Sequence, residues 1–244
     1  MNEFLARIAL DWHRTLENVL ASAQRSGRKS LVVFDLDSTV FDNRPRQARI
    51  VREYAKSKQL TALAKCQAWH FESGWDLKPA ALACGMTEAE FDPHARPLKD
   101  FWAQRFFTSD YCQDDIEVVG APRYLHAIAH TGTKLYYVTG RHEAMREGTM
   151  ACFAKCGMPL PDADGIVLLM KPTLLEGDDE YKRTAHSQLK ARGPVLAMFD
   201  NEPNHINDYA LRFPEAYAVH LATDHSGRTS RLEPGVISIP HFAW

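Results

Sequence analysis

Six short apolar runs recur along the chain, and segments with helical periodicity separate several of them. The helical segments cover residues 122–130, 142–155 and 180–191. Apolar runs of this length suit strands that are buried on both faces of a parallel sheet. Strand, helix and strand in alternation imply right-handed crossovers, so the sequence predicts an α/β fold: a Rossmann-like, open, mainly parallel sheet with helices on both faces. The predicted strands are residues 31–34, 134–139, 165–170, 195–200, 216–221 and 236–239.

A long region after the first predicted strand does not follow this alternation. Residues 43–120 contain no convincing strand, and their helical stretches are rich in alanine and in aromatic residues that suit a core of their own. We interpret this region as a helical cap inserted after the first strand; the alternative is that it extends the core. Residues 28–42 and 121–244 then form the core domain, and residues 1–27 form an amphipathic N-terminal helix that packs on it.

Composition narrows the classes of protein to which the chain can belong. Its 29 Lys and Arg residues and 31 Asp and Glu residues give a formal net charge of −2 over 244 residues. That balance argues against a general binder of nucleic acids or membrane surfaces. The five cysteines are an odd number and do not resemble a disulfide framework. Because the sequence shows neither a secretory signal nor an apolar run long enough to span a membrane, we expect a cytoplasmic protein.

Two acidic residues follow the first predicted strand directly. Asp35 and Asp37 lie at its carboxyl end, and Ser38 and Thr39 come next. In open α/β sheets, ligands bind at this edge. Two carboxylates so close repel each other unless a cation or a shared proton relieves them, and Mg²⁺ prefers oxygen ligands. The pair is therefore compatible with a Mg²⁺ site, but taken alone it fits solvated loop acids or a helix cap at least as well.

Two more strands bring polar residues to the same edge of the predicted sheet. The second predicted strand ends in a Thr-Gly-Arg sequence and the fourth in Asp-Asn-Glu, and two lysines lie between them. A site that handles phosphate needs a carboxylate nucleophile, a cation for the acids, and a hydroxyl and a lysine for the phosphate oxygens. The strand ends therefore predict a phosphate site that contains Asp35 and Asp37 together with Thr139, Gly140, Arg141, Lys171, Lys182, Asp200, Asn201 and Glu202.

These four motifs, in this order, resemble those of the haloacid dehalogenase (HAD) superfamily of phosphohydrolases. The resemblance implies that Asp35 is a nucleophile that forms an aspartyl-phosphate and that Asp37 is the general acid and base. It also implies that Thr139 binds the phosphoryl group. Mg²⁺ would be held by Asp35, Asp200 and the main-chain carbonyl of Asp37. Dehalogenases of the superfamily lack the second acid, so Asp37 favours phosphoester hydrolysis.

Two positions of the motifs leave a choice. Lys182 resembles the third-motif lysine that opens a helix, and we favour it for that role. Lys171 resembles the Lys-Pro form found in many sugar-phosphate phosphatases, and would be a second phosphate or substrate contact. In the fourth motif many relatives have a second acid, and here the candidates for holding a water on the metal are Asn201, Glu202, Asn204 and Asp208.

Some weaker signals lie beside the motifs. Arg44 and Arg46 follow the first motif and could grip an anionic substrate bidentately, although a solvated helix face is the alternative. Arg141 could likewise touch substrate, or only begin a helix. Cys152 and Cys156 lie one helical turn apart, and we expect buried thiols because no second pair or spaced His cluster supports zinc.

The resemblance implies a Mg²⁺-dependent phosphomonoester hydrolase that acts through an aspartyl-phosphate on a small phosphorylated metabolite. Three alternatives stay open: a phosphotransferase or phosphomutase, a nucleic-acid end phosphatase that uses the basic stretch after the first motif, and a catalytically silent module that binds a phosphorylated ligand. Specificity in the superfamily lies in the cap rather than in the fold of the core. The substrate therefore depends on residues 43–120.

Overall fold

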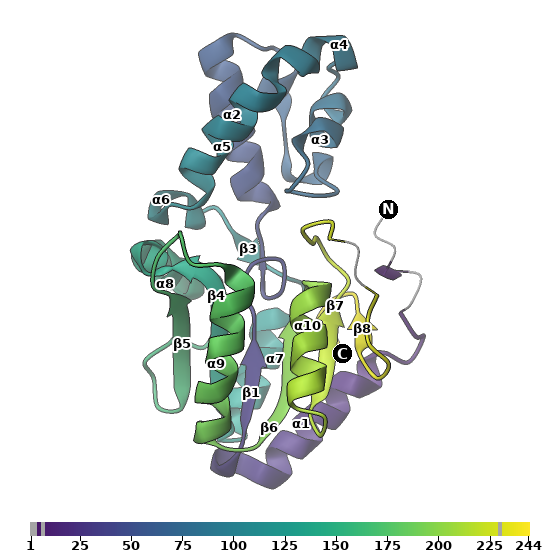
Figure 1. The fold of residues 1–244 in the computed structure, drawn as a ribbon, viewed down its shortest axis with the longest axis vertical. Helices are drawn as coiled ribbons and strands as arrows, with labels where there is room; N and C mark the ends of the chain where they lie inside the picture. The colour runs from purple at the N-terminus through teal and green to yellow at the C-terminus, as the bar shows by residue number, and fades with distance from the viewer. Residues whose placement is uncertain (1–3, 6–7, 229–230) are drawn as a thin grey trace.

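All six predicted strands form one parallel sheet in the computed structural model, which describes residues 4–5, 8–228 and 231–244. Every neighbouring pair of strands is parallel, and helices cover both faces (Figure 1). The predicted α/β fold is therefore confirmed. The strand order is β5-β4-β1-β6-β7-β8, with β1 Leu31–Phe34, β4 Lys134–His142, β5 Ile166–Lys171, β6 Val195–Asp200, β7 Tyr217–Leu221 and β8 Ile237–Ile239.

The position of β1 in the middle of the sheet fixes where a ligand can bind. From β1 the chain continues to β4 and β5 on one side, and it then returns to β6, β7 and β8 on the other side. The direction of winding thus reverses at β1. In open α/β sheets, the crevice at the carboxyl end of the strand where the order reverses is the usual binding site.

Alternate residues of β1 pack into two separate apolar layers. Leu31 and Val33 pack with one pair of helices, whereas Val32 and Phe34 pack with the helices on the opposite face. This strict alternation, with all four side chains buried, explains why the strand reads as a continuous apolar run. The first layer contains α9 Asp178–Arg192 and α10 Pro203–Arg212; the second contains α1 His13–Ser26, α7 Ala121–His130 and α8 Arg146–Lys155.

The N-terminal helix is shorter than the sequence predicts. It begins at His13 instead of near the start of the chain, and the predicted positions 1–3 and 6–7 lie outside the described residues. Phe4 is buried, and its ring packs edge-on against the ring of His220 in β7 at 4.6 Å between centroids. Packing against this strand therefore outweighs the local helical period, since helices in proteins depend mainly on tertiary contacts.

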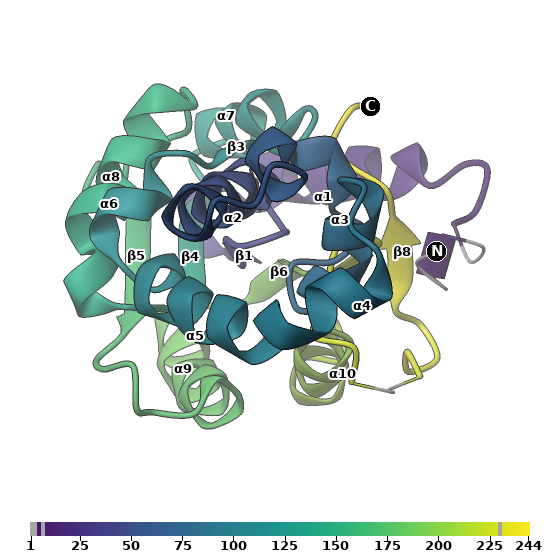
Figure 2. The same cartoon turned by 90° about the horizontal axis from the view of Figure 1, so that it is seen from above.

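The cap has an apolar core that is distinct from the two layers of the sheet. Ile50, Tyr54, Leu98 and Trp102 are among its buried residues. Seen from above, the cap helices lie over the central strands (Figure 2). We propose residues 43–120 as a separate unit on this basis. Its helices are α2 Arg44–Lys58, α3 Leu77–Ala83, α4 Glu88–Phe91, α5 Ala95–Phe106 and α6 Ser109–Cys112, with 3-10 turns at Leu63–Lys65, Ala68–His70 and Asp92–His94.

Two short strands join the cap to the core. β2 (Phe41–Asp42) pairs antiparallel with β3 (Ile116–Glu117), so the chain enters and leaves the cap side by side. The expectation that residues 43–120 contain no strand is therefore wrong at β3. A strand of two residues has no periodic pattern, because its pairing depends on a partner that lies far away in the sequence.

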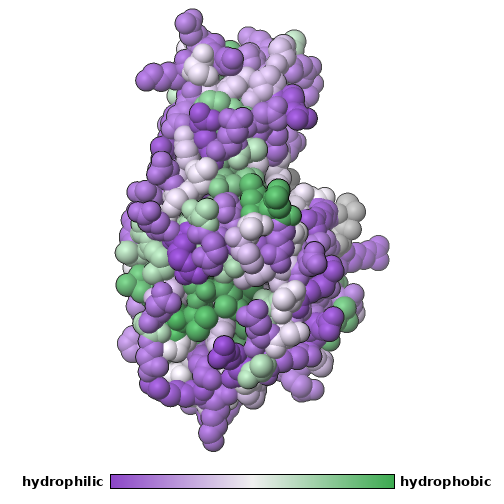
Figure 3. All heavy atoms as spheres, turned by 60° about the vertical axis from the view of Figure 1, so that its left-hand side comes forward, coloured by the Kyte–Doolittle hydropathy of each residue, from purple (hydrophilic) through white to green (hydrophobic). Residues whose placement is uncertain are grey.

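Hydrophilic residues predominate around apolar patches on the face of the molecule that Figure 3 shows. Within the described ranges, no helix is both long and apolar enough to cross a membrane. All five cysteines are free thiols.

We expect Leu16→Ala to lower the free energy of unfolding by about 2–5 kcal/mol, because Leu16 of α1 is fully buried between the sheet and α7. Urea denaturation followed by circular dichroism measures the change. Leu10→Ala is the matched control, since Leu10 is fully exposed and its truncation should alter stability by only about 0.5 kcal/mol. Equal effects of the two changes would show that α1 does not stabilise the core.

Candidate active site

Asp35 lies at the carboxyl end of β1, where the winding of the sheet reverses. Its main-chain N–H donates to the carbonyl of Phe199 in β6 at 2.9 Å, which continues the strand pairing up to the acid. The side chain is buried, with 7% exposed. The carboxylate accepts hydrogen bonds from Lys182 Nζ at 2.8 Å and from Thr39 Oγ1 at 3.2 Å.

Lys182 joins Asp35 to a second buried acid. Its Nζ also donates to Oδ2 of Asp200, the last residue of β6, at 2.6 Å. Burial opposes the ammonium charge, but the carboxylates of Asp200 and Asp35 outweigh it and raise the pKa of Lys182 well above its ordinary value. The lysine is therefore a fixed positive charge between two acids.

One ammonium does not balance two buried carboxylates. Burial, reinforced by the charge of Asp200 and opposed by Lys182, raises the pKa of Asp35 to about 7. Burial also acts to raise the pKa of Asp200, but the charges of Lys182 and His205 outweigh it and hold this pKa below its usual range. The carboxylate of Asp35 thus lacks a full counter-charge, and the site offers oxygen donors. This donor set fits a hard divalent cation.

Asp37 is held by a second group of charges. Its carboxylate accepts hydrogen bonds from Asn43 Nδ2 at 2.8 Å, from Arg46 Nη2 at 2.9 Å and from Arg141 Nη2 at 2.7 Å. Both arginines also bind Asp115, which is fully buried: Arg141 Nη2 lies 2.6 Å and Arg46 Nε 2.8 Å from its carboxylate oxygens. We call Asp37, Arg46, Asp115 and Arg141 the charge quartet.

The charge quartet keeps Asp37 ionised. Burial alone would raise the pKa of Asp37, but the guanidinium groups of Arg141 and Arg46 hold it well below its usual range. Arg46 comes from α2 in the cap and Arg141 from β4 in the core, so the quartet also joins the two parts. Asp115 was not predicted from the sequence. The one feature that could have pointed to it is its position just before the chain returns to the core.

The Thr-Gly-Arg motif is part of a strand. The second predicted strand ends at Thr139, but β4 continues through Gly140 and Arg141 to His142 because its pairing with β5 resumes after an irregularity. Thr139 is fully buried, and its Oγ1 accepts the main-chain N–H of Arg141 at 3.1 Å. Gly140 and Arg141 line the cavity above Asp35, whereas Thr139 is not among the lining residues.

Lys171 occupies a different place from Lys182. It ends β5, and its Nζ donates to Oδ1 of Asp178 at 2.5 Å. Asp178 lines the cavity but Lys171 does not. Of the two candidate lysines, the structure therefore brings only Lys182 to the acids.

The four candidates of the last motif divide into two groups. Asn201 accepts a hydrogen bond from Thr39 Oγ1 at 3.1 Å, Glu202 accepts the main-chain N–H of Ser226 at 2.7 Å, and both candidates line the cavity. Asn204 and Asp208 lie in α10 and are not lining residues. Asp208 instead pairs with Arg183 at 2.9 Å on the surface, so the structure does not bring it to the site.

The two candidate substrate arginines of the cap entrance do not reach the cavity. Arg44 forms a bidentate ion pair with Asp42 and lines a neighbouring hollow. Arg46 is fully buried in the charge quartet, which excludes the solvated helix face for this residue. Arg141 is the candidate substrate arginine that lines the cavity.

The cap supplies the apolar wall of the cavity. Trp75, Trp102, Phe106 and Phe107 face a floor formed by the acids and Lys182. Gly74 brings the cap to the core, because its main-chain N–H donates to Oδ2 of Asp224 at 2.8 Å. The sequence analysis did not single out Asp224, which follows the fifth strand of the sheet.

We expect Arg46→Met to lower the free energy of unfolding by about 3–5 kcal/mol, because it leaves the fully buried Asp115, together with Asp37, short of one positive charge. Arg49→Met is the matched control on the same helix. Arg49 also pairs with an acid, Asp114, but its side chain is 37% exposed, so its loss should cost about 1 kcal/mol or less. Urea denaturation compares the two, and a small effect of Arg46→Met would contradict this role of the quartet.

Comparisons with known proteins place the fold. The sequence matches no protein-family model and no curated protein. A Clostridium difficile protein assigned as a phosphatase superposes with a TM-score of 0.55 and 13% identity, over 87% of this chain and 94% of that one. The class C acid phosphatase of Bacillus anthracis with bound tungstate superposes with a TM-score of 0.49 and 16% identity, over 86% of this chain and 74% of that one. CbbY of Rhodobacter sphaeroides in complex with phosphate superposes with a TM-score of 0.47 and 14% identity, over 87% of this chain and 94% of that one. The first of these likenesses has a TM-score above 0.5 and shows that the two chains share a fold.

Proposed function

We propose that the protein is a Mg²⁺-dependent phosphomonoester hydrolase that acts through an aspartyl-phosphate. The observation that carries the proposal is the meeting of Asp35, Asp200 and Lys182 at the carboxyl end of β1, on the floor of a capped cavity. The Clostridium difficile neighbour, which is assigned as a phosphatase, supports the same class of activity. Because the cap covers the floor, we propose a small phosphorylated substrate and not the end of a nucleic acid.

Asp35, Asp200 and the main-chain carbonyl of Asp37 would hold Mg²⁺ in this proposal. The raised pKa of Asp35, which follows from burial beside Asp200, supports a need for a further positive charge there. When bound, the ion offsets the negative charge of the acids and of the phosphate. Asn201 and Glu202, which line the cavity, would keep a water in place.

The reaction would proceed in two displacements at phosphorus. An oxygen of Asp35 forms a bond to phosphorus while the bond to the ester oxygen breaks, and Asp37 gives its proton to the departing alkoxide. Asp37 then takes a proton from water as the water oxygen attacks phosphorus, which releases inorganic phosphate and restores Asp35. Lys182 compensates the negative charge of the phosphoryl oxygens in both steps.

Asp37 must gain a proton before it can act as the acid, and its contacts oppose this in the structure. Arg141 lines the cavity, so an incoming phosphate competes with Asp37 for its guanidinium. Loss of that contact raises the pKa of Asp37 toward its usual value. We therefore propose that the substrate itself prepares Asp37 for proton transfer.

We expect the purified protein to release phosphate from an aryl phosphate with Mg²⁺ and to lose this activity when a chelator is in excess. Asp35→Asn removes the nucleophile with little change in shape, so kcat should fall by about 10⁴-fold or more while circular dichroism stays unchanged. Unchanged turnover in this variant would falsify the mechanism.

The same assay separates the alternatives. Transfer of the phosphoryl group to an added alcohol or sugar in place of water would indicate a phosphotransferase. Tight binding of a phosphate analogue without turnover of any phosphoester would indicate a silent binding module. Turnover of a phosphorylated oligonucleotide end, with an affinity that falls steeply with salt, would indicate a nucleic-acid phosphatase.

We expect Lys182→Met to reduce kcat by about 10²–10³-fold, because it removes the ammonium that contacts Asp35 and Asp200. Lys171→Met is the matched control: this lysine is equally buried, but its partner is Asp178. Steady-state kinetics on both variants should show a much smaller loss for Lys171→Met. A reversed order would indicate that Lys171 binds the phosphoryl group.

A further inference from the structure

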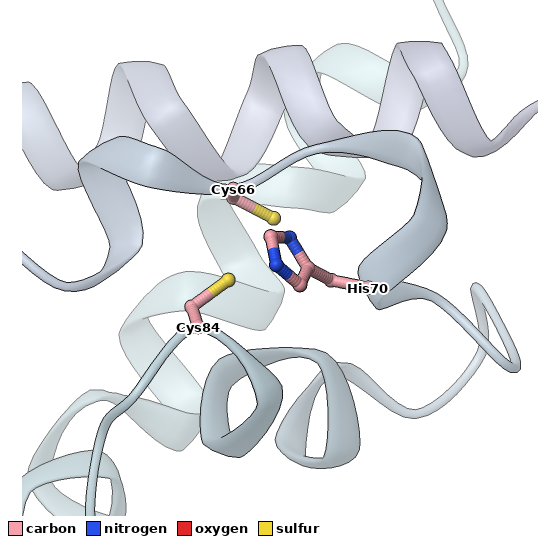
Figure 4. Close-up of side chains that lie close together, drawn as sticks. All are labelled: Cys66, His70 and Cys84. Atoms are coloured by element: carbon pink, nitrogen blue, oxygen red, sulfur yellow. The ribbon is translucent and has the colours of Figure 1, made fainter.

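Three metal-binding side chains meet inside the cap, on residues that do not line the cavity. Figure 4 shows the thiols of Cys66 and Cys84 with the imidazole of His70 directed toward both sulfur atoms. One potential ligand atom from each residue lies within 4.8 Å of the other two. We propose that these three residues bind a divalent cation that prefers sulfur and nitrogen, namely Zn²⁺.

The chemistry of the three ligands matches this ion. Zn²⁺ binds cysteine thiolates at about 2.3 Å and imidazole nitrogens at about 2.0–2.1 Å in a tetrahedral arrangement. Two thiolates and one neutral imidazole cancel its charge, which suits a site whose Cys66 is fully buried. The tetrahedral geometry brings the ligand atoms to roughly 3.5–3.8 Å from one another, so the side chains need to move by only about 1 Å.

The cap holds the three residues in place through its main chain. The carbonyl of Cys66 accepts a hydrogen bond from Arg52 Nη1 of α2 at 2.8 Å. Cys84 directly follows α3, where its N–H donates to the carbonyl of Ala80 at 3.0 Å. The ligands thus come from two separate parts of the cap. Cys66 and His70 lie at turns that pack on α2, and Cys84 directly follows α3.

His70 is oriented by its neighbour Gln67. The main-chain N–H of Gln67 donates to Nδ1 of His70 at 2.9 Å, which leaves the proton of the neutral ring on Nε2. Metal binding therefore competes with this contact: the ring binds through Nδ1 in place of the Gln67 N–H, or through Nε2 after its proton has moved to Nδ1, which then no longer accepts from Gln67. His70 and Cys84 are partly exposed, so water can occupy the fourth position.

The geometry suits a metal better than a pair of redox thiols. The imidazole of His70 lies against both sulfur atoms, which is the mixed sulfur and nitrogen set that Zn²⁺ takes (Figure 4). A bound cation stabilises both thiolates directly.

The proposed site lies behind the part of the cap that faces the cavity. The segment from His70 to Cys84 contains Gly74 and Trp75, which line the cavity, and Gly74 also donates to Asp224 of the core. An ion that joins His70 to Cys84 closes this segment into a loop and restricts its motion. The metal would therefore stabilise the substrate-facing segment; this last step alone rests on the proposed function.

Metal content and cobalt spectroscopy of the full-length reduced protein test the proposal. We expect about one Zn²⁺ per chain by elemental analysis. After replacement by Co²⁺, we expect the intense visible bands of a tetrahedral site with thiolate ligands. Removal of the metal should lower Tm by several degrees. Cys84→Ala should abolish both the zinc and the bands, and it changes a partly exposed side chain, so the fold should persist.

Cys156→Ala is the matched control, because Cys156 is also a free cysteine that directly follows the last residue of a helix, here α8. It should retain the metal and the cobalt spectrum. Asp35→Asn should retain them too, which separates this proposal from that of the active site. Failure of the reduced wild-type protein to take up Zn²⁺ or Co²⁺ overturns the proposal, and so does equal uptake by Cys84→Ala. Two missing thiols in a thiol titration of the metal-free protein would instead indicate a disulfide.

Discussion

The charge quartet is the interaction on which the arrangement of cap and core depends. Arg46 and Arg141 each contact both Asp37 and Asp115, so two positive charges offset two negative ones, and all but the partly exposed Asp37 are buried. Burial of charges is costly unless each has a partner, and loss of any member leaves one uncompensated. Because Arg46 belongs to the cap and Arg141 to the core, the favourable state of these charges exists only when the cap stands over the end of β1.

This arrangement connects the position of the cap with the chemistry proposed for Asp37. The contacts that hold the cap also keep the carboxylate of Asp37 ionised. A phosphate that draws Arg141 away would weaken one connection between cap and core, while Arg46 of the cap keeps its contact with Asp37 of the core. In the proposed function, the binding of an anionic substrate would therefore alter both the proton affinity of Asp37 and the attachment of the cap, through a single guanidinium group.

The sequence predicted the sheet well because each strand is buried on both faces and therefore reads as a short apolar run. The acids at the strand ends were likewise predictable, since parallel strands bring their carboxyl ends to one edge. Contacts between distant positions were not. Asp115 meets Arg46 across 69 residues, β3 meets β2 across a whole cap, and Phe4 leaves the helical period to pack on His220. No local period encodes such pairings.

The sequence alone does not decide whether Lys171 or Lys182 lies beside the acids, but the structure does. Both follow the pattern of a basic residue between the second and fourth motifs, and both are buried. Lys171 ends a strand and is neutralised by Asp178 from the first turn of α9. Lys182 lies one turn further along the same helix, and its ammonium is shared by Asp35 and Asp200. The helix α9 thus supplies Asp178, which pairs with Lys171, and it also places Lys182 beside Asp35 and Asp200. In the proposed function, the positive charge available to a phosphate would therefore depend on the register of α9 on the sheet.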